Sequence, residues 1–376
     1  MALVCKAFGD IITFTRASSA TFTGSNGLIQ SATTNTPRFD YDPVTLAAKG
    51  LLIEEQRTNL LTYSEDFSNA AWNKGTGGSI AANTVVAPDG TTTADAYTWA
   101  TSTSAFAFLT QVVSGTPTNP HTSSIWLKRP TGSGSRTVRL SVSDVSTSTG
   151  NSSDFTVTDS WQRFNFTRTS ATNTGSVGMG LQVGLAGTPI AAGEILEVWG
   201  AQLEAGAFAT SYIPTVASQV TRSADVASVN TLSPWYNATE GTLYAEATPY
   251  GVLPDTRIAA LDDGTSLNRH MIWGTLSSST TRYEVITGGV AQVGLTVNGT
   301  LVANTTTKAA AAYKVNDFAF SVNGGAALTD TVGTLPSVTA LRIGGSAGAP
   351  LFNGSIRRIT YYPRRLSNAE IQAITA

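Results

Sequence analysis

The chain has 376 residues, of which only 13% are charged, and its formal net charge is −2. This balance offers no basic surface for nucleic acid, and the single cysteine, Cys5, excludes an intramolecular disulfide and a zinc site of the usual cysteine spacing. No run of about 18 apolar residues is present, so no membrane insertion is predicted. Abundant Gly, Ser, Thr and β-branched residues, with few Lys and Glu, predict an all-β protein rich in turns.

Residues 1–60 are predicted to form an N-terminal arm or attachment module with short strands. The arm has too few apolar residues for a core of its own, so we expect it to pack on a neighbouring domain or on another subunit. Its stretch 36–61 surrounds Leu51-Leu52-Ile53 with charged residues, which predicts either a buried strand flanked by ion pairs or a docking element. The charged residues are Arg38, Asp40, Asp42, Lys49, Glu54, Glu55 and Arg57.

Residues 61–216 are predicted to form a jelly-roll β-sandwich, because strand-like runs alternate with turn signals along this stretch. In the last run, Leu196 and Val198 are predicted on one face and Ala201 and Leu203 on the other, as in a central strand. The runs are 96–99, 106–113, 122–128, 137–145, 161–169, 178–183 and 194–203.

A linker over 217–232 and a second β-sandwich over 233–376 are predicted next. Two asparagine–glycine turns, at Asn298-Gly299 and Asn323-Gly324, predict hairpins, since Asn and Gly accept positive φ. Near the end, Ser367 and Glu370 have the spacing of a capping box, which predicts a short C-terminal helix.

Four motifs mark the first 72 residues: Phe14 to Phe22, Gly27-Leu28-Ile29, Pro37 to Tyr41 and Gly50 to Leu60. Together they resemble a module of structural proteins of tailed bacteriophages, which stands before carbohydrate-binding-like β-sandwiches in tail, fibre and head-surface proteins. The resemblance implies a virion protein without saying which part of the particle carries it. It brings no catalytic residues with it.

Two further sets of motifs concern the sandwiches. The first set is Ser124 to Lys128, Trp161 to Phe164, Val198 to Glu204 and Gly206 to Pro214; the second is Gly241 to Tyr244, Leu341 to Gly345, Phe352 to Tyr361 and Arg365 to Ile371. The first resembles jelly-roll carbohydrate-binding modules, and the second resembles a concanavalin A-like, laminin G-like sandwich. Both resemblances concern fold and leave the ligand open.

Catalytic and metal sites have little support, so we predict no enzyme, no cofactor and no metal. His121 and His270 lack a nucleophile motif and are predicted to be loop residues. Glu246 has no acidic partner at a same-face position, which disfavours glycoside hydrolysis. Asp262-Asp263-Gly264 is the nearest calcium candidate, but it lacks partner ligands and is predicted to be a solvated turn.

Aromatic rings that stack on sugars are the remaining candidates for function. Trp126, Trp161 and Trp199 lie in strand patterns and are predicted to be core, whereas Trp72 and Trp99 stay open as ring candidates. The predicted ligand-binding residues occur in turn-rich surroundings and combine rings with a cation. They are Trp273, Arg269, Trp235 and Tyr236.

These observations predict a non-enzymatic surface protein of a phage particle, in the tail or a fibre, that takes part in adsorption to host glycans. Two alternatives stay open: a head decoration or head fibre with a purely structural role, and a polysaccharide depolymerase. The expected partners are other virion proteins and host surface polysaccharide. The resemblance to fibre proteins further implies that copies of this chain associate with closed symmetry, with a trimer favoured. Because the N-terminus lacks the features of a signal peptide, assembly in the host cytoplasm is expected.

Overall fold

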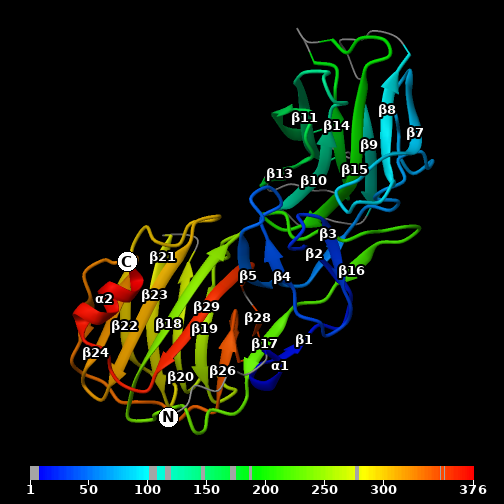
Figure 1. Ribbon diagram of the computed structural model, residues 1–376. Helices are drawn as coiled ribbons and strands as arrows, with labels where there is room; N and C mark the ends of the chain where they lie inside the picture. The colour runs from blue at the N-terminus through cyan, green and yellow to red at the C-terminus, as the bar shows by residue number, and fades with distance from the viewer. Residues whose placement is uncertain are drawn as a thin grey trace. The chain divides into compact units, whose positions relative to one another are not determined.

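The computed structural model describes residues 8–100, 108–114, 120–144, 149–169, 175–185, 189–275, 279–347, 349–350 and 352–376. These residues form antiparallel sheets with only short helices, so the predicted all-β class is confirmed (Figure 1). Neither helix in the described part of the chain has the length and hydropathy needed to cross a bilayer.

The chain divides into two compact units, and the division cuts across the predicted boundaries. Unit 2 comprises residues 28–31 and 57–222, whereas unit 1 takes the segments before, between and after them: up to residue 27, 32–56 and 223–376. Unit 1 is therefore assembled from segments that lie on both sides of unit 2 in the sequence.

Unit 2 is a sandwich of a five-stranded and a four-stranded sheet. The five-stranded sheet has the order β13 (Gln162–Arg168), β10 (His121–Lys128), β15 (Ile195–Ala205), β8 (Ala94–Trp99) and β7 (Gly78–Val85). The four-stranded sheet has the order β12 (Thr149–Val157), β11 (Arg136–Asp144), β14 (Ser176–Gln182) and β9 (Phe108–Ser114). All seven predicted runs correspond to strands in their described parts; residues 106, 107 and 145 of these runs lie outside the described residues. The two strands that the sequence did not predict, β7 and β12, are polar edge strands.

The core of unit 2 is formed by alternate residues that point inward from both sheets, among them Leu109, Leu140, Leu181 and Val198. The prediction for β15 was wrong in one respect: Leu196, Val198, Ala201 and Leu203 all belong to this core. The register against β10 shifts between Trp199 and Gln202, and Gly200 has φ +63°. This bulge reverses the alternation and aims both halves of the strand inward.

Unit 1 is a sandwich of two seven-stranded sheets. The β20 sheet has the order β1 (Thr13–Thr15), β17 (Val226–Val229), β26 (Ala340–Ile343), β19 (Thr256–Asp262), β20 (Arg269–Thr275), β21 (Thr280–Thr287) and β22 (Val290–Val297). The β18 sheet has the order β25 (Leu328–Asp330), β24 (Phe318–Val322), β23 (Thr307–Lys314), β18 (Glu240–Pro249), β29 (Gly354–Tyr362), β5 (Ala48–Ile53) and β4 (Phe39–Tyr41). The remaining short elements of the chain, which lie outside these large sheets in either unit, are α1 (Phe8–Ile11), β2 (Ala20–Thr23), β3 (Ile29–Ala32), β6 (Arg57–Asn59), β16 (Val220–Arg222), β27 (Gly345–Ser346), β28 (Ala349–Pro350) and α2 (Asn368–Thr375).

Strands of the predicted arm are built into these two sheets. Strand β1 pairs with β17, β5 pairs with β29, and β4 extends the β18 sheet beyond β5. Phe14, Leu51 and Ile53 enter the core of unit 1. The arm's few apolar residues are thus buried against strands that occur some 200 to 300 residues later in the sequence.

The charged residues of the arm form a buried cluster in unit 1. Arg16 Nη1 lies 3.1 Å from Asp225 Oδ1, Arg38 Nη1 lies 2.8 Å from Glu54 Oε2, and Arg38 also pairs with Asp225. Burial acts to lower the pKa of Arg38, but Glu54 and Asp225 outweigh it and raise that pKa. Of the two interpretations from the sequence, a strand flanked by satisfied ion pairs describes residues 38–54.

The two predicted hairpins and the helix have different outcomes. The turn at Asn323-Gly324 leads from β24 towards β25, which pairs with it, whereas residues 300–302 form no strand and β22 pairs with β21 instead. The capping box at Ser367 is present, with Glu370 N–H donating to Ser367 Oγ, and the predicted C-terminal helix α2 is confirmed.

Candidate functional site

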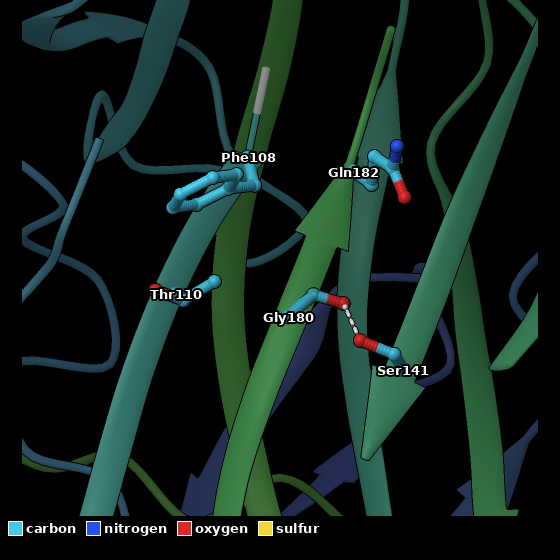
Figure 2. Close-up of a pocket in the computed structure, with 5 residues that line it drawn as sticks. All are labelled: Phe108, Thr110, Ser141, Gly180 and Gln182. Atoms are coloured by element: carbon cyan, nitrogen blue, oxygen red, sulfur yellow. Dashed lines mark hydrogen bonds between the residues drawn. The ribbon is translucent and has the colours of Figure 1, made fainter. Parts of the chain in front are cut away.

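The open face of the four-stranded sheet in unit 2 carries a groove. Successive rows of side chains cross this sheet, because the strands pair in register and alternate residues point outward. One row is Asp154, Arg139, Gln182 and Phe108; the next is Ser152, Ser141, Gly180 and Thr110. A cavity of about 210 Å³ lies over these rows, lined by Phe108, Thr110, Ser141, Gly180 and Gln182 (Figure 2).

Glycine forms the floor of the groove. A Cβ atom at Gly180 would lie 2.6 Å from Ser141 Oγ and 3.5 Å from Thr110 Cγ2, so any larger residue would fill the space between β9 and β11. With glycine at this position, Ser141 Oγ donates a hydrogen bond to the Gly180 carbonyl oxygen at 3.1 Å (Figure 2). Gly178 occupies the next outward position on β14, which lowers the floor along the strand.

The walls combine one ring with polar groups. Phe108 is half-buried and supplies a flat apolar surface, while Thr110 and Ser141 supply hydroxyl groups. The Gln182 amide donates from Nε2 to the Gly184 carbonyl at 3.0 Å, and its side chain lines the cavity. A ring beside hydroxyl and amide groups suits a sugar, whose faces are apolar and whose edges carry hydroxyls.

An ion pair borders the groove on its far side. Arg139 Nε and Nη2 lie 2.6 Å and 3.0 Å from the two carboxylate oxygens of Asp154. Hydrogen bonding within this pair raises the pKa of Arg139 and lowers the pKa of Asp154. Because each charge is matched by its partner, the groove as a whole is close to neutral.

The sequence analysis missed this groove because it searched among tryptophans and tyrosines near turns. A signal was nevertheless present in β14, where Gly178 and Gly180 alternate with Met179 and Leu181. Glycine at successive outward positions of a predicted strand indicates a face kept free of side chains.

Two of the residues predicted to bind a ligand, Arg269 and Trp273, share the outer face of β20 in unit 1. Arg269 is held by Glu284, whose Oε1 lies 2.7 Å from its Nη2. The cation beside the Trp273 ring is Arg282 instead, with its Cζ 4.8 Å from the ring centroid. The structure brings the predicted ring together with a different arginine, because the pairing of β20 with β21 sets Arg282 directly opposite Trp273.

The other two, Trp235 and Tyr236, lie against the core of unit 1. The Trp235 ring packs edge-on against Tyr361 at 5.1 Å, and its indole N–H donates to the Thr231 carbonyl. Tyr236 lies 5.6 Å from the same Tyr361 ring, and burial raises the pKa of its hydroxyl. Both rings support the fold at this position, and their role in binding stays a prediction.

The remaining tryptophans are mostly core. Trp126 and Trp199 are buried and lie 5.3 Å apart, and Trp161 packs beside them with its indole N–H donating to the Val86 carbonyl. Trp72 and Trp99, which had stayed open, are buried in the core of unit 2.

The prediction that both histidines are loop residues was wrong. His121 lies in β10 and His270 in β20, and both are buried. Burial lowers the pKa of His270 to about 3, and its Nδ1 lies 2.8 Å from the Tyr283 hydroxyl. Burial and the nearby Arg168 lower the pKa of His121. Both rings are therefore neutral at physiological pH.

The carboxylates considered for catalysis or calcium have protein partners. Glu246 lies opposite Lys308 and Arg358, with Arg357 Nη1 at 3.6 Å. Asp262 accepts from the backbone N–H groups of Gly264 and Ala347, and Asp263 accepts from Thr265 and Asn268. In the part of the chain that the structure describes, no three His, Cys, Asp or Glu side chains gather as metal ligands would.

Comparisons with known proteins complete the description. No family model matches the chain, and no curated protein matches it. Among solved structures it is similar to the CBM40 of the Ruminococcus gnavus IT-sialidase, with 17% identity, a TM-score of 0.33 and coverage of 37% of this chain and 84% of that one.

Two other similar structures are the NanB sialidase from Streptococcus pneumoniae and a heptameric SAP-like pentraxin from Limulus polyphemus. The sialidase has 16% identity and a TM-score of 0.32, over 37% of this chain and 24% of that one. The pentraxin has 11% identity and a TM-score of 0.30, over 39% of this chain and 79% of that one. Each likeness spans less than half of this chain, so the function is argued below from geometry.

Proposed function

We propose that this chain is a non-enzymatic glycan-binding protein, and that the groove of unit 2 holds a neutral sugar. The observation that carries the proposal is the glycine floor between Phe108 and Ser141, which gives a sheet face one open space beside one ring. An apolar ring face can stack on Phe108 while sugar hydroxyls bond to Thr110, Ser141 and Gln182.

The volume and charge of the groove narrow the ligand further. A cavity of about 210 Å³ fits a single pyranose ring rather than a long stretch of chain. The Arg139–Asp154 pair at its border offers a donor and an acceptor to a neighbouring ring without selecting for charge. A groove that holds one sugar ring, with neighbouring sugar rings at its border, suits recognition of a repeating surface polysaccharide.

Glycan binding by soluble protein tests the proposal directly. The wild-type protein should bind neutral glycans on an array, and Phe108→Ala should weaken that binding by about tenfold or more, because it removes the stacking ring. Gly180→Val should abolish it by filling the groove. Val112→Ala is the matched control: this exposed valine lies on the same strand and face but outside the groove.

Failure of every neutral glycan to bind contradicts the proposal. Unchanged binding by a folded Phe108→Ala variant contradicts the assignment of the groove. Release of reducing ends from host polysaccharide during incubation would favour the depolymerase alternative instead.

The biological setting that we propose is the surface of a phage particle, with the chain in the tail or a fibre, assembled with other virion proteins as a trimer. The motifs between Phe14 and Leu60 support this setting. Labelling of intact particles with an antibody to unit 2, together with light scattering of the purified protein, tests it. Labelling over the head would favour the decoration alternative, and a monomer would contradict the trimer.

A further inference from the structure

The outer face of the β20 sheet in unit 1 carries a row of charged and aromatic side chains. Trp273 on β20 lies directly between Arg257 on β19 and Arg282 on β21. Thr296 on β22 continues the row beyond Arg282. Ile272, the residue before Trp273 on β20, belongs to the core of unit 1. Successive side chains of a strand point to opposite faces of the sheet, so the row that contains Trp273 points away from the core.

Three of the four arginines on this face are matched by carboxylates. Arg257 Nε lies 3.1 Å from both oxygens of Asp255. Arg269 Nη2 lies 2.7 Å from Glu284, and Arg342 Nε lies 3.3 Å from Asp262. Within each pair, the positive and the negative charge cancel. The face therefore has a net positive charge only if the fourth arginine has no carboxylate partner.

Arg282 is that fourth arginine. Its Nε donates to Thr296 Oγ1 at 3.1 Å, and its Cζ lies 4.8 Å from the centroid of the Trp273 ring. Among the residues that the structure describes, no carboxylate forms an ion pair with it. Stacking on the indole and the bond from Nε hold the guanidinium plane in place, while Nη1 and Nη2 are left to donate to a ligand.

The indole N–H of Trp273, beside Arg282, is a second hydrogen-bond donor whose partner is missing from the described part of the chain. Its indole nitrogen is buried and has no acceptor among the described residues. A buried donor without an acceptor costs stability, and this one is shielded from a ligand on the sheet face. The donor that a ligand can reach is the fixed guanidinium fork of Arg282, which suits a planar anion with two oxygens.

We propose that the Trp273–Arg282 platform binds the carboxylate of an acidic sugar. The single unbalanced positive charge of Arg282 matches a monovalent carboxylate better than a phosphate dianion, because the other three arginines are already paired with carboxylates. Glu284 and Thr296 lie beside the platform and offer acceptors for the hydroxyl groups of the same sugar. This site lies in unit 1 and does not depend on the groove of unit 2.

The test is binding of a glucuronate-containing oligosaccharide to the full-length protein, measured by calorimetry beside the matching oligosaccharide of glucose and beside acetate. The acidic oligosaccharide should bind and the neutral one should bind at least about tenfold more weakly at this site. Acetate should bind more weakly than the acidic oligosaccharide, since it lacks the hydroxyl contacts. Equal binding of acetate and oligosaccharide would overturn the assignment of a sugar.

Variants locate the site. Arg282→Gln should weaken binding of the acidic oligosaccharide about tenfold to a hundredfold, because it removes a charge-assisted pair of hydrogen bonds. Arg282→Lys keeps the charge but loses the flat fork, so an intermediate loss is expected. Arg364→Gln is the matched control, since it removes an exposed arginine of the same unit that pairs with Glu370. Phe108→Ala should also leave this binding unchanged.

Unaltered affinity in a folded Arg282→Gln variant overturns the proposal. So does a loss of equal size in Arg364→Gln, because that would show a general effect of charge. Should Arg282→Gln fail to fold, Arg282→Lys decides: wild-type affinity in that variant would contradict the need for a planar guanidinium on Trp273.

Discussion

Unit 1 and unit 2 share the β-sandwich architecture and differ in how they handle charge. In unit 1, buried Asp225 lies between two arginines, and the open β20 sheet carries the platform with its unbalanced Arg282. In unit 2, the hydrogen bonds that buried Asp95 accepts within the described ranges come from the backbone N–H groups of Phe67 and Asn83, and the open groove is close to neutral. The two units therefore differ in the charge of their open sheet faces, and the two proposed ligands differ in charge accordingly.

The largest expected effect concerns the paired charges of unit 1. Asp225→Ala removes a buried carboxylate that pairs with both Arg16 and Arg38, so we expect unit 1 to lose about 3–5 kcal/mol of unfolding free energy. Hydrogen exchange read separately on peptides of each unit measures this, and unit 2 should be unaffected. Asp154→Ala, which breaks an exposed pair in unit 2, serves as the control and should cost under about 1 kcal/mol.

Undiminished protection of β1 and β5 in the Asp225→Ala variant would contradict this account. It would also remove the contrast between the units, because the ion pairs of unit 1 would then contribute no more to stability than a surface pair.

The next effect concerns the unpaired carboxylate of unit 2. Burial raises the pKa of Asp95 from 3.8 to about 6, so the folded state binds this proton more tightly than the unfolded state. Stability from this group is greatest at low pH, falls as the pH rises from about 4 to about 6, and is fully lost above that range. The shift corresponds to about 3 kcal/mol. Thermal unfolding of unit 2 against pH measures it.

Asp95→Asn is the matching variant. It removes this titrating group, so the fall in stability between pH 4 and 6 should become shallower for unit 2, and the slope that remains is expected from Glu65, whose pKa burial also raises. A slope of the same size in Asp95→Asn would assign the effect to another carboxylate.

The smallest expected effect is at the platform. Trp273 is half-buried and covered by Arg282, so Trp273→Ala should cost about 1 kcal/mol of stability, whereas Trp199→Ala in the core of unit 2 should cost about 3–5 kcal/mol. The melting temperatures of the two variants make the comparison. A loss in Trp273→Ala as large as that in Trp199→Ala would make this ring part of the core and weaken the case for a ligand there.

The strands of unit 2 were predictable because each combines alternating apolar residues with a turn signal at its end. Edge strands β7 and β12 lacked the apolar half of that pattern, since one or both of their faces meet water. The cap of α2 was predictable because Ser367 and Glu370 interact locally. The sequence was sufficient to predict an element where the interaction that determines the element joins residues close together in the chain.

Long-range pairing accounts for what the sequence analysis did not find. Ion pairs around Arg38 were one interpretation of the sequence, but Asp225 was not identified as the carboxylate that Arg16 and Arg38 share. Arg282 becomes a partner of Trp273 only through the register of β20 with β21. The groove likewise needs three strands side by side before Phe108 and Gly180 define a space. None of these contacts can be predicted from the number of residues that separate the partners in the sequence.

The interrupted sequence of unit 1 has a consequence for synthesis on the ribosome. The main segment of unit 2, residues 57–222, begins and ends with paired strands, β6 and β16, and all of the unit has been made once residue 222 has emerged. Strands β1 and β5 must wait until β17 and β29 have been translated, with the arginines of the arm hydrated in the meantime. We therefore expect the inserted domain to fold first and the outer domain to close around Asp225 only after β29 has been translated.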